Sequence, residues 1–299
     1  MRPWLPLLLC FMLTSAPLHA ELRIFTCEPE WAALAGELAG DKADIFTATT
    51  AQQDVHYIHA RPSLIARLRR ADLVVCTGAD LEIGWLPLLL RRSSNANVLP
   101  GAVGNFAASS YVKMLEKPKT LDRSEGDMHP GGNPHIHLDP RNIVPIAKAL
   151  SERLASLDAD NAASYRANAA DFLQRWEKAL QTWDQRKTGL KGMPIVVYHD
   201  AWIYLNHWLG LKQLAELEPK PGIPPTSSHL SSVLSLMKQQ PARAIIYAPY
   251  QDAHAVQWLN KKTGIAELQL PFTVGGNPQA KDLFTLFDST LDLLLGVSD

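Results

Sequence analysis

The sequence predicts an α/β fold of two similar lobes, each a mostly parallel sheet flanked by helices, joined by one long rigid helix. Short apolar runs alternate with helical patterns in both halves of the chain, as in parallel sheets. Between the halves, residues Ile146 to Thr188 contain neither Gly nor Pro. We therefore expect an N-terminal lobe at 21–145, a connecting helical segment at 146–190 and a C-terminal lobe at 191–299.

The composition is that of an ordinary globular protein. Of the 299 residues, 46% are hydrophobic and 20% are charged, and the formal net charge is -1. No basic stripe stands out, which argues against a nucleic-acid partner. We expect a monomer.

The first twenty residues have the features of a secretory signal peptide. Arg2 gives a positive start, Leu5–Leu13 is an apolar core, and Ala16–Ala20 ends in small residues. The apolar run is too short to span a bilayer, and leucines precede Cys10 where a lipoprotein would carry small residues. A buried first strand or a membrane anchor is the alternative. We predict cleavage after Ala20 and a soluble protein of the periplasm.

The N-terminal half shows four strand-like runs and three helical patterns. Ala71–Gly78 (ADLVVCTG) is an apolar run of the kind that fills a parallel sheet. Pro62 and Ser63 suit the opening of a helix. The expected strands are Leu22–Cys27, Asp44–Thr49, Ala71–Gly78 and Asn97–Leu99, and the expected helices are Glu30–Ala39, Pro62–Arg70 and Asp80–Leu90.

Residues Ala107–Pro134 are polar and lack apolar periodicity, so we expect a long loop. Such loops are usually functional or mobile, and we expect Lys117–Gly132 to be mobile without metal. His129 near its tip is either a transient contact for incoming zinc or an incidental surface histidine.

The connecting segment shows the periodicity of a long helix, and the C-terminal half again alternates strands with helices. Apolar residues recur at three- and four-residue steps along the connector, which indicates one packed face of a long helix: Tyr165, Ala169, Phe172, Trp176, Leu180 and Trp183. The expected strands that follow are Gly192–Tyr198, Leu211–Glu218, Ala244–Ala248 and Glu267–Leu270, and the helices are Ala201–Leu209, Leu230–Gln239, Ala253–Thr263 and Asp282–Leu295.

Two cysteines remain in the mature chain. Cys27 and Cys76 each end a strand-like run. An exported protein matures in an oxidising compartment, so an even pair favours a disulfide over two buried thiols. Neighbouring parallel strands lie about 4.8 Å apart, a distance that a disulfide can bridge. We predict that the bond joins two neighbouring strands of the N-terminal lobe.

Residues Gly131–Asn142 (GGNPHIHLDPRN) place two histidines between a Gly/Pro-rich loop and a helix start. Asp139 can cap this helix, and Pro140 suits its first turn. Alternate residues of an extended segment face opposite sides, so His135 and His137 cannot both face one site. Neutral imidazole is a common zinc ligand, which makes one of the pair a candidate ligand.

Three histidines share one structural context. His56, His135 and His199 each lie in a loop or at the end of a strand, just before a helix. In α/β sheets such positions meet at one crevice beyond the carboxyl ends of the strands. Three imidazoles and one carboxylate make a closed tetrahedral site for Zn2+. The sequence therefore predicts a zinc site built from both halves of the chain.

Four segments, and the connecting helix, carry a resemblance to a known family: His56–Ser63 (HYIHARPS), Ala71–Leu86 (ADLVVCTGADLEIGWL), Asn133–Pro140 (NPHIHLDP) and Tyr198–Trp202 (YHDAW). The chain resembles the zinc- or manganese-specific solute receptors of ABC transporters over essentially its whole mature length. The resemblance implies that His56, His135 and His199 are ligands. Manganese members carry a carboxylate at the third position, so His199 favours zinc. The resemblance also implies delivery of the ion to a membrane permease.

Two loops refine the resemblance. Glu218–Gly222 (EPKPG) and Pro271–Gly276 (PFTVGG) look most like AztC-like members, which also accept zinc from a periplasmic chaperone. The metal-gathering loop of many zinc receptors is sparse here, since Lys117–Asn133 has one histidine, His129, near Glu125 and Asp127. The family's FTD-type segment reads PFTVGG, so its carboxylate is missing from that place.

We expect Asp282 to supply the fourth ligand. A buried uncompensated charge is costly, and the family takes a carboxylate from the last part of this lobe. Asp282 follows the PFTVGG loop and begins the final helix, although it can instead merely cap that helix. The alternatives are Asp252, Asp288, His229, His59 and water, and His59, His129 and His137 are expected as accessory metal contacts.

Two other functions compete with a zinc receptor. A secreted zinc-dependent hydrolase needs an open coordination position and a fixed general base. The HExxH spacing is absent, and Glu216 and Glu218 are only loose candidates for the base. A surface adhesin is the third reading, since the same fold hosts adhesins in other bacteria. We expect a binding protein and no enzyme.

Overall fold

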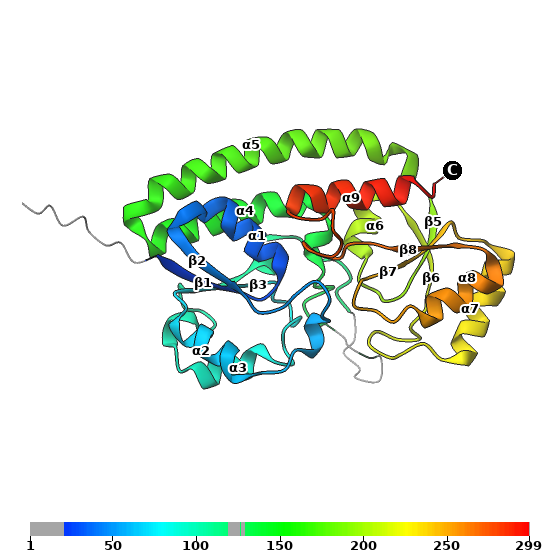
Figure 1. The fold of residues 1–299 in the computed structure, drawn as a ribbon, viewed down its shortest axis with the longest axis horizontal. Coiled ribbons are helices and arrows are strands. Elements are labelled where there is room, and N and C mark those ends of the chain that lie inside the picture. Colours follow the sequence, from blue (N-terminus) through cyan, green and yellow to red (C-terminus); the bar gives the residue numbers. More distant parts are fainter. Residues whose placement is uncertain (1–20, 119–125, 127–128, 299) are drawn as a thin grey trace, which may run out of the picture.

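The computed structural model describes residues 21–118, 126 and 129–298. The predicted cleavage after Ala20 and most of the segment Lys117–Gly132 lie outside these residues. Two four-stranded sheets form the framework (Figure 1), and their strands pair in parallel throughout the described chain. The strands are β1 Leu22–Thr26, β2 Ala43–Thr47, β3 Leu73–Cys76, β4 Asn105–Ala107, β5 Pro194–Val197, β6 Lys212–Glu216, β7 Ala244–Tyr247 and β8 Ala266–Gln269.

The first sheet has the order β2-β1-β3-β4 and the second the order β6-β5-β7-β8. We call the units around them the N-lobe and the C-lobe. The helices that flank the sheets are α1 Pro29–Ala39, α2 Pro62–Arg70, α3 Leu86–Ser93, α4 Pro140–Leu157, α5 Ala162–Arg186, α6 Ile203–Leu209, α7 Ser227–Gln239, α8 His254–Thr263 and α9 Leu283–Leu295. The predicted two-lobed α/β fold is confirmed. Over the described ranges, none of these helices has the length and hydropathy needed to span a membrane.

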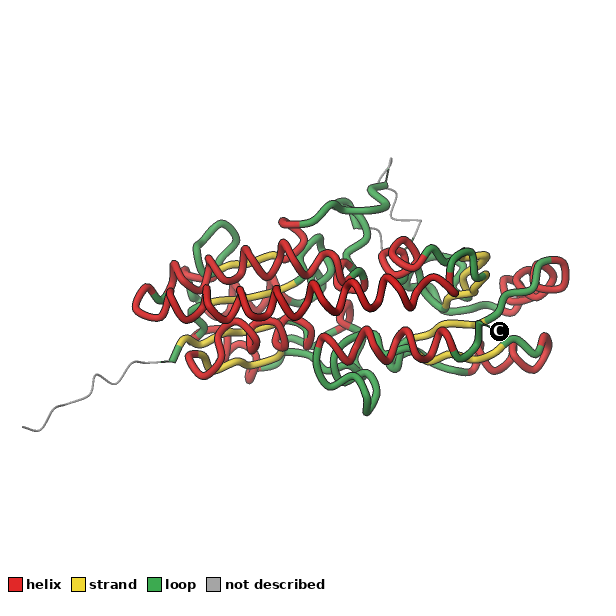
Figure 2. The backbone as a smooth tube through the Cα atoms, turned by 90° about the horizontal axis from the view of Figure 1, so that it is seen from above, coloured by secondary structure: helices red, strands yellow, loops and turns green. Residues whose placement is uncertain are grey.

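Helix α5 joins the lobes. It arches over both sheets in Figure 1, and the view from above in Figure 2 shows it running along the long axis of the molecule. Its inner face is buried as the spacing predicts, with Phe172, Trp176 and Trp183 at 1% exposure or less. These side chains belong to one apolar cluster that also contains Ile24 of the N-lobe and Leu291 of α9. Because one core runs through both lobes and the helix, α5 is a stiff connection.

The connecting segment consists of two helices. Helix α4 begins at Pro140 and is capped by Asp139, whose Oδ1 accepts a 2.9 Å hydrogen bond from the Arg141 amide. The chain then turns at residues 158–161 before α5 begins, and α4 and α5 pack side by side. The sequence pattern did not reveal this turn, because no Gly or Pro marks it.

Two predicted elements of the N-lobe are wrong. Asn97–Leu99 is not a strand: Ala96–Val98 is a 3-10 turn, held by the Asn95 side chain, which accepts a 3.2 Å hydrogen bond from the Asn97 amide. The fourth strand is instead β4, three residues long and too short to show a period. The helix expected from Asp80 begins only at Leu86, because Ala79 and Asp80 adopt left-handed conformations.

The predicted disulfide is present. Cys27 directly follows β1, Cys76 ends β3, and these strands are neighbours with a Cα–Cα distance of 4.8 Å. Both residues are buried.

Two buried glutamates, Glu28 and Glu82, lie beside the disulfide. Burial and the charge of Glu82 raise the pKa of Glu28. Burial raises the pKa of Glu82 to about 7.

Candidate metal centre

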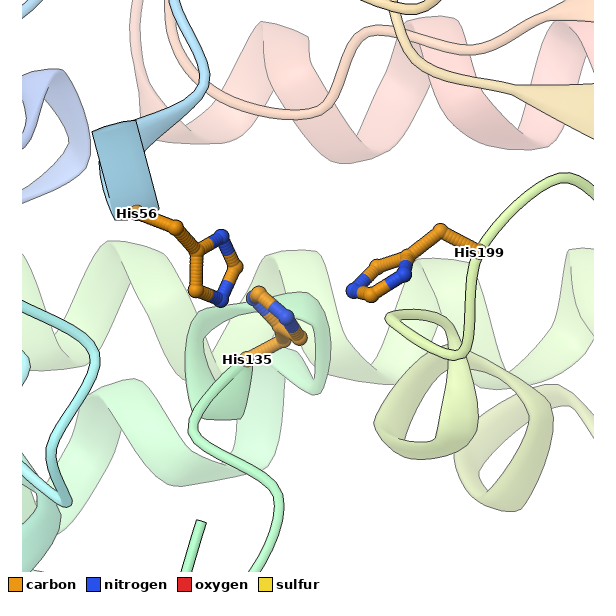
Figure 3. A group of neighbouring side chains, drawn as sticks. All are labelled: His56, His135 and His199. Atoms are coloured by element: carbon orange, nitrogen blue, oxygen red, sulfur yellow. The ribbon is translucent and has the colours of Figure 1, made fainter. Parts of the chain in front are cut away.

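The three predicted histidines converge between the lobes (Figure 3). His56 lies in a 3-10 turn after β2, His135 directly precedes the turn at Ile136–Leu138, and His199 follows β5. One ring nitrogen from each lies within 4.8 Å of the others. His135 and His199 are buried, with exposures of 1% and 8%. The N-lobe side and the C-lobe therefore both contribute to one cluster of imidazoles.

Two carboxylates orient the outer rings. Nδ1 of His56 lies 2.8 Å from Oδ1 of Asp54, and Nδ1 of His199 lies 2.7 Å from Oε2 of Glu218. Each contact leaves Nε2 to the centre, and Nε2 of His56 is buried without a hydrogen-bond partner among the described residues. Metal-binding histidines typically donate their other nitrogen to a carboxylate, which sets the tautomer and the ring orientation. The donor set fits a borderline cation such as Zn2+.

The pKa values of His135 and His199 are shifted in opposite directions. Burial lowers the pKa of His135 well below its ordinary value, and the neighbouring histidines lower it further. His135 is therefore neutral at neutral pH and can accept a cation without losing a proton. Burial also disfavours the charged form of His199, but the hydrogen bond and charge of Glu218 outweigh it and raise the pKa of His199. His199 is the ring at which protons compete with a metal ion.

His137 lies outside the group of converging ring nitrogens, although its ring, like that of His135, packs against Phe272. Its Nε2 lies 2.9 Å from the backbone oxygen of Phe272, and its Nδ1 lies 3.3 Å from Oε1 of Glu30. Oε2 of the same glutamate accepts a 2.5 Å hydrogen bond from Thr273. These contacts connect α1 of the N-lobe to the PFTVGG loop of the C-lobe. His137 thus contacts both lobes.

Asp282 lies outside the group that the structure brings together. Its carboxylate caps α9 by accepting a 2.7 Å hydrogen bond from the Thr285 amide, and Thr285 reciprocates in a capping box. The alternatives are engaged elsewhere. Asp288 accepts from Trp183 and Arg186, Asp252 contacts His254, and His229 bonds the backbone oxygen of Glu216.

His129 approaches the cluster from the polar loop. Its ring centroid lies 5.4 Å from that of His56. Together with His135 and His199 it lines a cavity of about 310 Å³, which Glu116 also lines. His59 is exposed and lines a separate cavity beside His56 and His129.

Sequence reasoning missed the two orienting carboxylates. Asp54 stands two residues before His56, and its side chain also accepts the His56 amide at 3.0 Å, so local spacing was an available signal. Glu218 was considered only as the base of a hydrolase. Its contact with His199 depends on the pairing of β5 with β6, which brings residues 19 positions apart together.

Comparison with known proteins decides the family. The family described as zinc-uptake complex component A, periplasmic (ZnuA), matches residues 24–295, which is most of the chain. The chain belongs to this family. Its members are solute receptors of ABC transporters, not enzymes.

Curated relatives include zinc and manganese proteins. The high-affinity zinc uptake protein ZnuA of Yersinia pestis is 27% identical over 251 residues, 79% of this chain and 78% of that protein. The manganese transporter lipoprotein PsaA of Streptococcus pneumoniae is 23% identical over 274 residues, 89% of this chain and 85% of that protein. The match to the zinc-binding lipoprotein AdcA of Streptococcus pneumoniae, at 22% identity, spans 77% of this chain but only about half, 45%, of AdcA.

Solved structures share the fold. A crystal structure of ZnuA superposes with a TM-score of 0.77 at 21% identity, covering 94% of this chain and 100% of that one. A mutant of the laminin-binding adhesin Lmb from Streptococcus agalactiae superposes with a TM-score of 0.76 at 20% identity, covering 93% and 100%. The likeness extends over both lobes and the connecting helix.

Proposed function

We propose that this protein is an exported, periplasmic receptor that captures Zn2+ between its lobes and delivers it to an ABC permease for zinc import. The observation that carries the proposal is the convergence of His56, His135 and His199, each with a ring nitrogen within 4.8 Å of the others. Membership of the ZnuA family supports the same function. In this proposal residues 21–145 form the N-lobe, 146–190 the connector and 191–299 the C-lobe.

Zinc is favoured over manganese by the chemistry of the donors. Imidazole suits zinc, whereas manganese prefers carboxylate, carbonyl and water oxygens. His199 takes the place where manganese receptors are expected to carry a carboxylate. The carboxylates of Asp54 and Glu218 contact the outer nitrogens of His56 and His199, which leaves the inner nitrogens of these rings to the ion.

Capture requires little movement of the lobes. His56 and His135 stand on the N-lobe side and His199 on the C-lobe, already close enough to share an ion. The contacts of Glu30 with Thr273 and of His137 with Phe272 hold the lobes together beside the site. A stiff α5 and these ties favour a small local closure over a wide hinge motion.

The ligand at the fourth coordination position of the zinc ion is the next question. We infer that His129 or a water completes the shell, because Asp282 is occupied in its capping box. Asp282→Asn retains a capping side chain and should leave the zinc dissociation constant unchanged. With His129 as the ligand, His129→Ala should weaken zinc binding by roughly tenfold or more, on the scale of lost metal-site partners; with a water as the ligand, it should leave binding unchanged. Chelator competition measures both constants, and the opposite order would return Asp282 to the coordination shell.

Zinc affinity should fall as the pH drops. A proton on His199 must leave before zinc binds, so affinity is full above the raised pKa of His199 and is lost as the pH falls through it. Glu218→Gln removes the charge that raises this pKa, so the fall should move to lower pH. Above the transition the same variant should bind about 10–100-fold more weakly. Chelator competition across a pH series tests this, and an unmoved transition would contradict the role of Glu218.

The partners follow from the proposed function. A membrane permease receives the ion, and the AztC-like loops at Glu218–Gly222 and Pro271–Gly276 support loading by a periplasmic chaperone. We propose that the receptor acts as a monomer. The function is tested by expressing the exported chain, isolating it from the periplasm and measuring its metal content and zinc uptake by the cells. Zinc in the protein, with uptake lost on deletion, is expected. Protein that carries manganese, or uptake that survives deletion, would contradict the proposal.

A further inference from the structure

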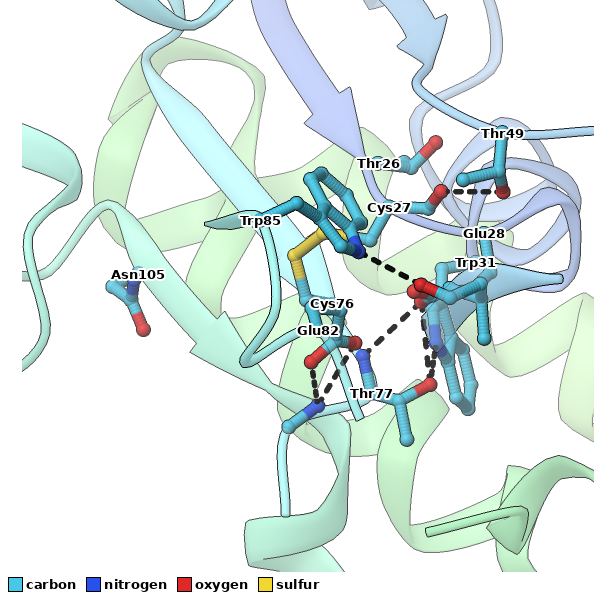
Figure 4. The surroundings of a disulfide bond; sticks show 12 residues. Thr26, Cys27, Glu28, Trp31, Thr49, Cys76, Thr77, Glu82, Trp85 and Asn105 are labelled. Atoms are coloured by element: carbon cyan, nitrogen blue, oxygen red, sulfur yellow. Dashed lines mark hydrogen bonds between the residues drawn. A yellow bond between two sulfur atoms is a disulfide. The ribbon is translucent and has the colours of Figure 1, made fainter. Parts of the chain in front are cut away.

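A second cluster of metal-binding side chains surrounds the disulfide of the N-lobe. Cys27 Sγ, Cys76 Sγ and a carboxylate oxygen of Glu82 lie within 4.8 Å of one another. All three residues are buried, with exposures of 0%, 4% and 3%. Figure 4 shows the two sulfurs and the Glu82 carboxylate beside the ends of β1 and β3. The group shares no residue with the three histidines.

The oxidation state of sulfur decides what this cluster can bind. A disulfide offers no thiolate, and the thiolate is the metal ligand. Reduction would leave two cysteines and one glutamate, a donor set that zinc accepts. We propose that Cys27, Cys76 and Glu82 form a second zinc site that exists only when the Cys27–Cys76 disulfide is reduced.

Hydrogen bonds hold the Glu82 carboxylate in place beside the two sulfurs. Both oxygens of Glu82 lie within hydrogen-bond distance of the Gly78 amide, at 3.2 and 3.1 Å. Oε2 of the neighbouring Glu28 accepts from the Thr77 amide and hydroxyl, each at 3.2 Å. Oε1 of Glu28 is buried and has no hydrogen-bond partner among the described residues.

The cluster is reachable from the surface. Cys76 and Glu82 line a cavity of about 690 Å³ between α3 and β4. Ile83 and Leu99, which are 63% and 40% exposed, line the same cavity and form its rim. A small reductant and a metal ion therefore have a route to the sulfur of Cys76 that does not pass through the histidine centre.

The reaction balances with a dithiol as reductant. Two electrons break the Cys27–Cys76 bond, each Sγ gains a proton, and the two sulfurs of the dithiol join in a new disulfide. Zinc then replaces the two thiol protons, which leave to solvent. Because zinc binds only the reduced form, it shifts the equilibrium toward reduction. A reducing, zinc-rich environment would thus convert a structural bond into a metal site.

Metal counting tests the proposal. The mature protein is reduced with a dithiol, freed of reductant by anaerobic gel filtration, loaded with zinc, filtered again and analysed for zinc and for thiols. Reduction should add one zinc per chain, whatever the histidine centre holds, so failure of the histidine site would not mask the result. Loading with Co2+ instead should produce a thiolate-to-cobalt charge-transfer band in the reduced protein and none in the oxidised protein.

Two variants serve as controls. Glu82→Gln should weaken the added site by at least about tenfold, comparable to the loss of a metal-site partner, and leave the histidine centre unchanged. The double variant Cys27→Ser, Cys76→Ser should show neither the added zinc nor the cobalt band. Reduced protein with two titratable thiols but no added zinc and no cobalt band would overturn the proposal. Loss of the tryptophan near-ultraviolet circular dichroism on reduction, with or without zinc, would also overturn it.

Discussion

Replacing His135 or His199 by alanine should lower zinc affinity at least about a hundredfold, more than the 10–100-fold typical of groups that only support a ligand. Each change removes one of the three nitrogens that lie within 4.8 Å of one another. The carboxylates of Asp54 and Glu218 contact the outer nitrogens of His56 and His199, not the inner nitrogens that converge. Chelator competition at neutral pH gives the dissociation constants.

The matched control is His137→Ala. This residue is two positions from His135 and equally buried, but its ring contacts Phe272 and Glu30. Its loss should reduce the stability of the interlobe contact and leave zinc affinity much closer to that of the native protein. Equal losses from His135→Ala and His137→Ala would contradict the assignment of His135, and not His137, as a zinc ligand.

Removing the disulfide should lower the free energy of unfolding by about 4 kcal/mol. The bond closes a loop with a sequence separation of 49 residues, and the chain-entropy model assigns that cost to a loop of this length. The double variant Cys27→Ala, Cys76→Ala is compared with the oxidised native chain by urea unfolding. The expected result is a lower midpoint with zinc affinity retained, because neither cysteine contributes to the histidine centre.

The native chain unfolded in a thiol reductant, without zinc, is the control for that experiment. Its midpoint should approach that of the double variant, since both lack the same cross-link. A native and a variant chain with equal midpoints under oxidising conditions would show that the bond does not restrict the unfolded chain.

The α/β alternation was predictable because the buried strands are short apolar runs with recognisable ends. Ala71–Gly78 reads as a strand from composition alone, and β3 lies within it at Leu73–Cys76. The predicted strand Asn97–Leu99 is wrong for a local reason, because the side chain of Asn95 holds the backbone in a turn there. The actual fourth strand, β4, is recognised only by its pairing with β3. Pairing between distant segments is not visible in a local pattern.

The three histidines were predictable from their shared position before helix starts, together with the family resemblance. The residues around these histidines were harder to predict. From the sequence, Asp282 was expected as a ligand, with helix capping as the alternative. Its capping box with Thr285 depends on the backbone geometry of α9. Glu218 reaches His199 only because β6 lies beside β5.

X-ray absorption of the oxidised, zinc-loaded protein identifies the ligands of the histidine centre. We expect nitrogen and oxygen ligands at about 2.0–2.1 Å, without sulfur at about 2.3 Å. We also expect outer-shell scattering from at least three imidazole rings, which belong to His56, His135 and His199. A spectrum with fewer than three imidazoles, or with a sulfur ligand in the oxidised protein, would contradict the three-histidine centre.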